Sequence, residues 1–471
     1  MLSGAGTAGA YHAGVLRALH EAGVKIDIVA GVGMGVASAL FAAVDGGARL
    51  WEQDGLWRGH AALRMYRWRR TLHVGLAALA IALGVLVLPL SLFLVAVLVY
   101  PAAFLLEVLG LSVGPDLVAG YGRLLASAFA PEAIPTILPR ILVLALLVLL
   151  VMLAAGLVQA ARAGARRRER GPVWWRAFGA PIVAEDVTAR FADALWSLIR
   201  GTTIRRSSLE DLSQSYTELL RENLGQPGFR ELLVTAHDLD ARRDLIFALL
   251  TEPHRQAFFA RRAGPEGDRR QSEILDLAGV GGRHLGDALA GGVTVPVGAE
   301  PHLIEFAADG YWRGETHRLC SRPDALGRVI DELMVAGAEQ VLLVSASAEL
   351  SGAHTLGAGR RDPRGRLGEY LNASEAAALR GATVTRARRL RGGYVIRPAH
   401  NPLGPFDFRG AYDDRSDRDI PLSELVECGY QDAYRQFVDP VIGAGGDRLH
   451  QTTREEEAAR KTPRPVDGPT P

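Results

Sequence analysis

The chain has 471 residues, 48% of them hydrophobic, and a formal net charge of +1 at pH 7. This length allows two or three domains, and the near-neutral charge argues against nucleic acid as a partner. The only two cysteines, Cys320 and Cys428, are too few for a disulfide framework and lack the spacing of metal ligands. We therefore expect no metal site and no cofactor.

A glycine-rich loop opens the chain. Gly4, Gly6 and Gly9 precede a helical pattern, and such a loop presents backbone N–H groups that can hold an oxyanion or a phosphate. The same spacing fits a dinucleotide fingerprint, with Asp27 where a ribose-binding acid would stand. That fingerprint requires a full strand before its first glycine, and only Met1-Leu2-Ser3 precede Gly4. Dinucleotide binding is therefore a remote alternative.

A second glycine turn follows. Ile26-Asp27-Ile28-Val29-Ala30 is typical of a short buried strand, and residues 36–44 are typical of a helix. Between them, Gly31-Val32-Gly33-Met34-Gly35 has the frame of a G-x-S-x-G nucleophile elbow, with Gly33 in the place of the serine. We expect a positive φ at Gly33, at a sharp strand-to-helix turn.

Together these motifs resemble the patatin-like phospholipase family, which combines a G-G-G-x-R-G oxyanion loop, a G-x-S-x-G elbow and a distant Asp-Gly-Gly motif. The chain departs from that pattern at Gly33, at Ala8 in place of the arginine, and at Tyr311 in place of the second glycine. The site residues that the resemblance implies are the oxyanion-hole positions Gly4, Ala5, Gly6 and Gly9, the elbow positions Gly31, Met34 and Gly35, the nucleophile position Gly33, and the catalytic aspartate Asp309.

The resemblance also implies an α/β fold, a patatin-like three-layer α/β/α domain interrupted by an inserted transmembrane segment. Residues 1–62 and 180–445 would form this domain. Its later elements would include a strand at 231–240 that leads into an Asp-Leu turn, a small-residue helix at 288–296 and a strand at 340–345. Residues 446–471 lack apolar periodicity and are expected to be disordered.

Two long apolar runs predict membrane insertion within residues 71–161. Residues 71–106 and 141–161 contain no Asp, Glu, Lys or Arg, and about 20 apolar residues suffice for one crossing. Arginine clusters at 64–70 and 162–170 flank the insertion and should remain cytoplasmic, which requires an even number of crossings, most simply two. We expect an integral protein of a bacterial inner membrane with its globular part in the cytoplasm.

The first apolar run is too long for one straight crossing and contains Pro89 and Pro101. We expect a kinked or interfacial segment around residues 101–111.

The family chemistry is acyl-ester hydrolysis of lipids, in which an aspartate activates a serine that forms an acyl-enzyme. The first functional hypothesis is thus a membrane-anchored lipid acyl hydrolase, and the alternative is a catalytically inactive lipid-binding pseudoenzyme, because Gly33 has no hydroxyl. Ser38 lies inside the predicted helix, and Ser3 and Thr7 have no base beside them in the sequence. If Asp309 and the loop keep the family geometry, Gly33→Ser should restore weak esterase activity. Membrane lipids are the expected partners in either case.

The first strand of such a fold would be unusually short here. With only three residues before the loop, the strand beginning near Ile26 should face a vacancy on one side. We expect the missing apolar residues to be encoded upstream of Met1. The alternative is a shortened strand in which Leu2 and Ser3 make the only hydrogen bonds of the ladder.

Overall fold

The computed structural model describes residues 1–167, 179–199, 208–260, 272–308, 312–348, 359–385 and 389–443. The chain divides into two compact units, one comprising Met1–Arg67 with Ile182–Pro471, and the other Trp68–Pro181. Asp309 and the predicted tail at 446–471 lie outside the described residues.

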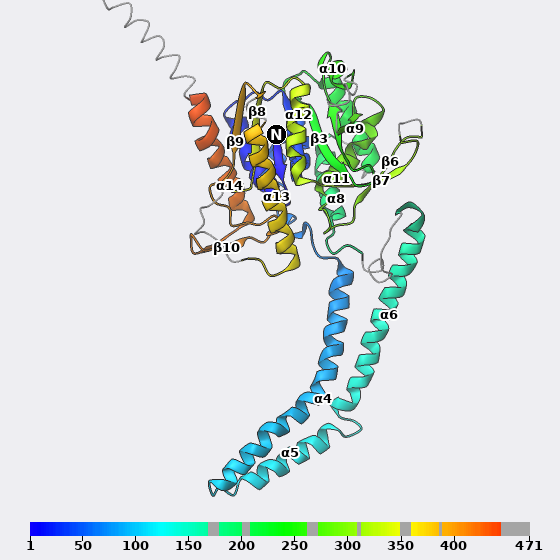
Figure 1. Cartoon of the computed structure of the whole chain (residues 1–471), viewed down its shortest axis with the longest axis vertical. Coiled ribbons are helices and arrows are strands. Elements are labelled where there is room, and N and C mark those ends of the chain that lie inside the picture. The colour runs from blue at the N-terminus through cyan, green and yellow to red at the C-terminus, as the bar shows by residue number, and fades with distance from the viewer. Residues whose placement is uncertain are drawn as a thin grey trace, which may run out of the picture. The chain divides into compact units, whose positions relative to one another are not determined.

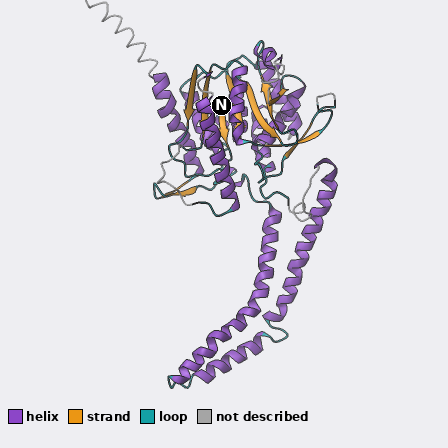
Figure 2. Cartoon of the chain, in the orientation of Figure 1, coloured by secondary structure: helices purple, strands orange, loops and turns teal. Residues whose placement is uncertain are grey.

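The first unit is built on a mixed sheet with helices on both faces (Figure 2). Its central order is β5-β4-β3-β2-β1-β8-β9, and a hairpin of β6 and β7 attaches to β3. Neighbours are parallel except for β3–β4, β3–β7 and β6–β7. The strands are β1 (Leu2–Gly4), β2 (Ile28–Gly33), β3 (Glu231–Asp238), β4 (Arg243–Leu249), β5 (Ser272–Asp276), β6 (His302–Glu305), β7 (Thr316–Cys320), β8 (Gln340–Ser345) and β9 (Gly392–Ile396).

Successive side chains of the buried strands point to opposite faces of the sheet, and each face is covered by its own layer of helices. Val29 and Leu232 point into the larger core cluster, which contains residues of α1, α2, α8, α9, α11 and α14. Ala30 and Leu233 point into the opposite cluster, with residues of α10 and α12. The predicted α/β class is therefore confirmed.

The helices of this unit are shown in Figure 1. They are α1 (Ala8–Glu21), α2 (Met34–Ala43), α3 (Ala48–Trp51), α8 (Glu185–Ile199), α9 (Leu209–Asn223), α10 (His254–Ala260), α11 (Leu285–Val293), α12 (Leu326–Val335), α13 (Pro363–Thr385) and α14 (Leu422–Ala433). Short 3-10 turns lie at Ala62–Arg64, Val280–His284 and Pro323–Ala325, a π-helix spans Tyr434–Gly443, and a separate hairpin joins β10 (Ala411–Asp413) to β11 (Arg418–Ile420).

β1 is a strand of three residues beside the six residues of β2. β1 pairs with β2 only from Leu2, opposite Gly31, so the first residues of β2 have no β1 partner. A cavity of about 550 Å³ lies at this end of the sheet, lined by residues including Met1, Ile28 and Leu342. The Met1 ammonium donates a hydrogen bond to the Leu342 carbonyl (2.7 Å), and its burial lowers its pKa to about 5.

Within its described residues, the second unit contains the helices α4 (Arg70–Val108), α5 (Gly114–Ala128) and α6 (Ile134–Arg167). Two of its segments, Arg70–Val108 and Ile134–Val158, are long and apolar enough to cross a membrane, judged by length and composition. Their apolar side chains are mostly exposed. The helices touch through small residues, since Ala78, Ala82 and Ala103 are among the few buried side chains of α4.

Candidate functional site

The expected elbow is present at the junction of β2 and α2. Gly33 is the last residue of β2 and the N-cap of α2, with φ 64° and ψ −129°. This confirms the predicted positive φ. The flanking glycines are required by close backbone approach, because a Cβ at Gly31 would lie under 3.0 Å from the Gly35 carbonyl, and one at Gly35 under 3.0 Å from the Leu2 carbonyl.

The space that a side chain at position 33 would need is already filled. A Cβ built on Gly33 would lie under 3.0 Å from the carbonyl oxygen of Gly4, a distance that real Cβ atoms essentially never show. The Ser321 hydroxyl would lie 3.3 Å from the same Cβ. The elbow therefore keeps the backbone of a nucleophile turn but presents a backbone acceptor where a side chain would begin.

The glycine loop satisfies several of its donors internally. The N–H groups of Ala8 and Gly9 donate to the carbonyls of Ala5 (3.1 Å) and Gly6 (3.3 Å) at the start of α1. The Thr7 N–H donates to the Pro405 carbonyl (2.9 Å), and a Cβ at Gly6 would collide with that same carbonyl. A distant part of the chain thus accepts a hydrogen bond from the loop that the sequence assigned to oxyanion binding.

Residues 403–408, which we call the covering loop, contact the glycine loop and are also bound by two arginine side chains. The Thr7 hydroxyl donates to the Gly404 carbonyl (2.9 Å). Arg360 forms an ion pair with Asp407, and Arg364 donates to the Phe406 carbonyl. Because Arg364 belongs to α13, the covering loop and the start of this helix are held together.

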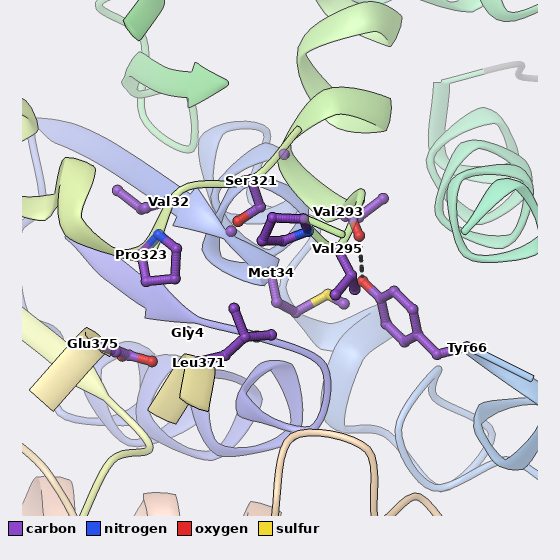
Figure 3. A pocket seen from close by; sticks show the side chains of 14 residues that line it. Gly4, Val32, Met34, Tyr66, Val293, Val295, Ser321, Pro323, Leu371 and Glu375 are labelled. Atoms are coloured by element: carbon purple, nitrogen blue, oxygen red, sulfur yellow. Dashed lines mark hydrogen bonds between the residues drawn. The ribbon is translucent and has the colours of Figure 1, made fainter. Parts of the chain in front are cut away.

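Only a small cavity remains beside the elbow. Its volume is about 10 Å³, which holds about one water, whereas ligand pockets are typically about 300–1,000 Å³. Figure 3 shows Ser321 and Glu375 on different sides of this cavity, with Pro323 between them. The cavity is too small for an acyl chain.

Glu375 is a buried acid that the sequence analysis did not identify. It lies on α13, accepts a hydrogen bond from the Ser345 hydroxyl (2.6 Å), and lines the cavity next to Gly4. Burial raises its pKa, and the hydrogen bond from Ser345 partly offsets that effect. No local sequence motif marks Glu375, because only the packing of α13 brings it to the glycine loop.

His12 is a second buried polar residue near the loop. Its Nε2 lies 2.9 Å from the Ser3 carbonyl and its Nδ1 lies 3.3 Å from the Ser38 hydroxyl. Burial lowers the pKa of His12 to about 4. A neutral imidazole with an N–H on Nε2 fits these partners, which makes His12 a structural link between α1 and α2.

The described neighbours of Asp309 make contacts within their own loop and with β5. The Phe306 N–H donates to the Glu315 carbonyl (3.0 Å), which closes the loop between β6 and β7. Trp312 donates from Nε1 to Glu273 on β5 (2.9 Å). Asp309 itself lies outside the described residues, so its place relative to Gly33 stays a prediction.

The β6–β7 hairpin is held to β3 by a buried pair. The fully buried carboxylate of Asp238 accepts hydrogen bonds from His317 Nδ1 (2.6 Å) and from the N–H groups of Asp240 (2.8 Å) and Ala241 (3.0 Å). Burial lowers the pKa of His317, but the hydrogen bond and the charge of Asp238 outweigh it and hold the pKa above 6.5. This turn corresponds to the predicted Asp-Leu turn after the strand at 231–240.

Within the described ranges, no group of three or more His, Cys, Asp or Glu side chains is arranged to hold a metal ion. Cys320 is buried and Cys428 is partly buried, both as free thiols.

Comparison with known proteins identifies the N-terminal part of the chain. Residues 1–85 match the family model described as patatin-like phospholipase. This range contains the glycine loop, the elbow and α2. No curated protein matches the chain.

Proposed function

From the match of residues 1–85 to the patatin-like phospholipase family, we propose that this chain is a membrane-anchored, catalytically inactive patatin-like protein that acts as a binding module. The family match suggests lipid acyl hydrolysis as the ancestral chemistry. That chemistry needs a hydroxyl at the elbow and free N–H groups facing it.

The observation that carries the proposal is the contact between Gly4 and the side-chain space of Gly33. Position 33 has no serine, and the Gly4 carbonyl oxygen lies under 3.0 Å from the place where a serine Cβ would be. A carbonyl oxygen at that place would also repel a developing oxyanion, so the electrostatics are the reverse of those in a working oxyanion hole.

The covering loop supports the same conclusion. Its Pro405 carbonyl accepts the hydrogen bond from Thr7 N–H, and the small cavity leaves no room for a bound acyl chain. The Pro405 carbonyl of the covering loop also packs closely against Gly6. We therefore do not propose dinucleotide binding at the glycine loop.

Membrane anchoring is part of the proposal and rests on the second unit. α4 and α6 expose apolar side chains along most of their length, which is costly in water and favourable in a bilayer. The arginine clusters at 64–70 and 162–170 favour a cytoplasmic location for both flanks, with two crossings between them. Membrane lipids are then the expected contacts of this unit.

A serine-directed fluorophosphonate probe tests the loss of catalysis. We expect the purified wild-type chain to remain unlabelled and to leave short-chain esters and phospholipid vesicles unhydrolysed, because no activated hydroxyl lies at the elbow. Heat-denatured protein serves as the background control. Labelling that maps to a single serine would overturn the proposal.

Ser321 is the one observation that favours a second candidate, a residual lipid acyl hydrolase. Its hydroxyl lies 3.3 Å from the Cβ position of Gly33 and lines the cavity. No carboxylate or imidazole among the described residues hydrogen-bonds to it. Fluorophosphonate labelling that maps to Ser321 and disappears in Ser321→Ala would favour this hydrolase over the pseudoenzyme.

Excision of the second unit tests the anchoring. The Arg67 carbonyl accepts a hydrogen bond from Val183 N–H (3.0 Å), so the two ends of the first unit are adjacent. Replacing residues 70–180 with a short glycine-serine linker should move the protein from the membrane fraction to the soluble fraction. Circular dichroism provides the folding control, and a folded excision variant that still sediments with membranes would contradict the anchor.

A further inference from the structure

The helix α4 is about twice as long as one membrane crossing requires. It contains 39 residues, which at about 1.5 Å per residue span about 58 Å, whereas the hydrocarbon core is about 30 Å thick. Pro89 lies near its middle. Figure 1 shows α6 running beside the first half of α4 and α5 folded back along the second half. We call residues 90–128 the distal hairpin.

Specific contacts hold the distal hairpin together. The Tyr121 hydroxyl donates to the Leu92 carbonyl (2.8 Å), and its ring packs edge-on against Tyr100. Phe93 and Phe129 form a second aromatic contact, with ring centroids 5.5 Å apart. α5 is therefore a packed partner of α4 and not a loose connection.

The side of α5 that faces away from α4 carries the polar residues of this helix, and Leu117 and Leu124 are also exposed on α5. Its contact face carries Gly114 and Tyr121, both buried. Asp116, Arg123 and Ser127 are exposed and fall on the opposite side at helical spacing. With 15 residues, α5 is about 22 Å long, so it is too short to cross the hydrocarbon core and carries two charges that a crossing would bury.

The outer face of the second half of α4 is mostly apolar. Its exposed side chains include Leu94, Leu98 and Phe104, and Leu98 is 72% exposed. No charged residue occurs in α4 between Arg70 and Glu107, near its end. This surface continues the apolar surface of the first half without interruption.

We propose that the distal hairpin lies in the interfacial zone of the extracytoplasmic leaflet, with α4 against acyl chains and the polar stripe of α5 against water. The inference rests on the membrane anchoring proposed above, in which the arginine flanks are cytoplasmic. A layer with one apolar and one polar side fits a lipid–water boundary, because each side then meets a matching environment. The partner of this surface is the lipid leaflet itself.

Depth-dependent quenching tests the proposal in the full-length chain. Single cysteines at Leu83→Cys, Leu98→Cys and Ser127→Cys, in a Cys320→Ala, Cys428→Ser background, carry an environment-sensitive fluorophore. The protein is reconstituted in phosphatidylethanolamine–phosphatidylglycerol vesicles that contain a lipid quencher near the headgroup or in mid-chain. A membrane-impermeant maleimide added to intact spheroplasts reports exposure to water on the outer side.

We expect the Leu98 label to be quenched more strongly from near the headgroup and the Leu83 label more strongly from mid-chain. Ser127→Cys should react with the impermeant maleimide, and Leu83→Cys should not. Mid-chain quenching at both Leu98 and Ser127 would show a spanning hairpin and overturn the proposal. Protection of Leu98 from both quenchers and from maleimide would show a protein partner, such as a second copy, and would also overturn it. An unquenched Leu83 label would instead refute the membrane anchoring.

Discussion

Gly33→Ala is expected to destabilise the protein by about 2–6 kcal/mol. An L-residue in the backbone conformation of Gly33 costs roughly 1–3 kcal/mol, and forcing a Cβ against packed backbone adds about 1–3 kcal/mol. The Gly4 carbonyl that it would meet belongs to β1 in the middle of the sheet, so it cannot turn aside cheaply. The thermal midpoint of the detergent-solubilised chain should fall by several degrees.

Gly23 offers a matched control for this substitution. Its φ of +65° is nearly that of Gly33, but a Cβ there would meet nothing within 4 Å. Gly23→Ala should therefore cost only the backbone term, roughly 1–2 kcal/mol. Equal losses in the two variants would show that the Gly4 contact contributes nothing.

The same contact changes the expectation for Gly33→Ser. The family motifs suggest that this variant would regain weak esterase activity, whereas the structure places the Gly4 carbonyl against the new side chain. We now expect Gly33→Ser to show no hydrolysis of a short-chain ester above the Gly33→Ala background. Activity in Gly33→Ser would mean that the Gly4 peptide rotates and that only the hydroxyl has been lost.

The elbow could be predicted from sequence because its cause is local. Glycines at positions 31, 33 and 35 between a buried strand and an apolar helix indicate a tight strand-to-helix turn. The structure has the expected positive φ at Gly33. The resemblance also implied a strand at Gln340–Ser345, and the structure contains it.

The blocked state of the site could not be predicted, because its causes are distant in the chain. The Thr7–Pro405 hydrogen bond joins residues almost 400 positions apart, and Glu375 reaches Gly4 only through the packing of α13. No periodicity or short motif carries such information. The role of Asp309, which came from the resemblance alone, stays a prediction.

Asp238→Ala is expected to destabilise the protein by about 3–5 kcal/mol, because it leaves the buried His317 and two partly buried backbone N–H groups without their acceptor. Asp240→Ala is the control, since its paired charge with Arg318 is partly exposed and should contribute about 1 kcal/mol or less. Chemical denaturation of the detergent-solubilised variants measures both.

The pair of Asp238 and His317 should also make the stability of the protein depend on pH. The pKa of His317 is raised in the folded chain, so the charged pair stabilises the fold fully below pH 6.5, and that stabilisation is lost as the pH rises through the folded pKa. The wild-type chain should therefore lose stability as the pH rises above 6.5, and Asp238→Asn should lose less over the same rise. Stability profiles that fall equally with pH in wild type and Asp238→Asn would contradict a stabilising ion pair between Asp238 and His317. The hairpin would then be held to β3 by its backbone hydrogen bonds alone.

The strand β7 leads directly into Ser321. Weakening the Asp238–His317 pair should therefore also increase the mobility of Ser321 beside the elbow.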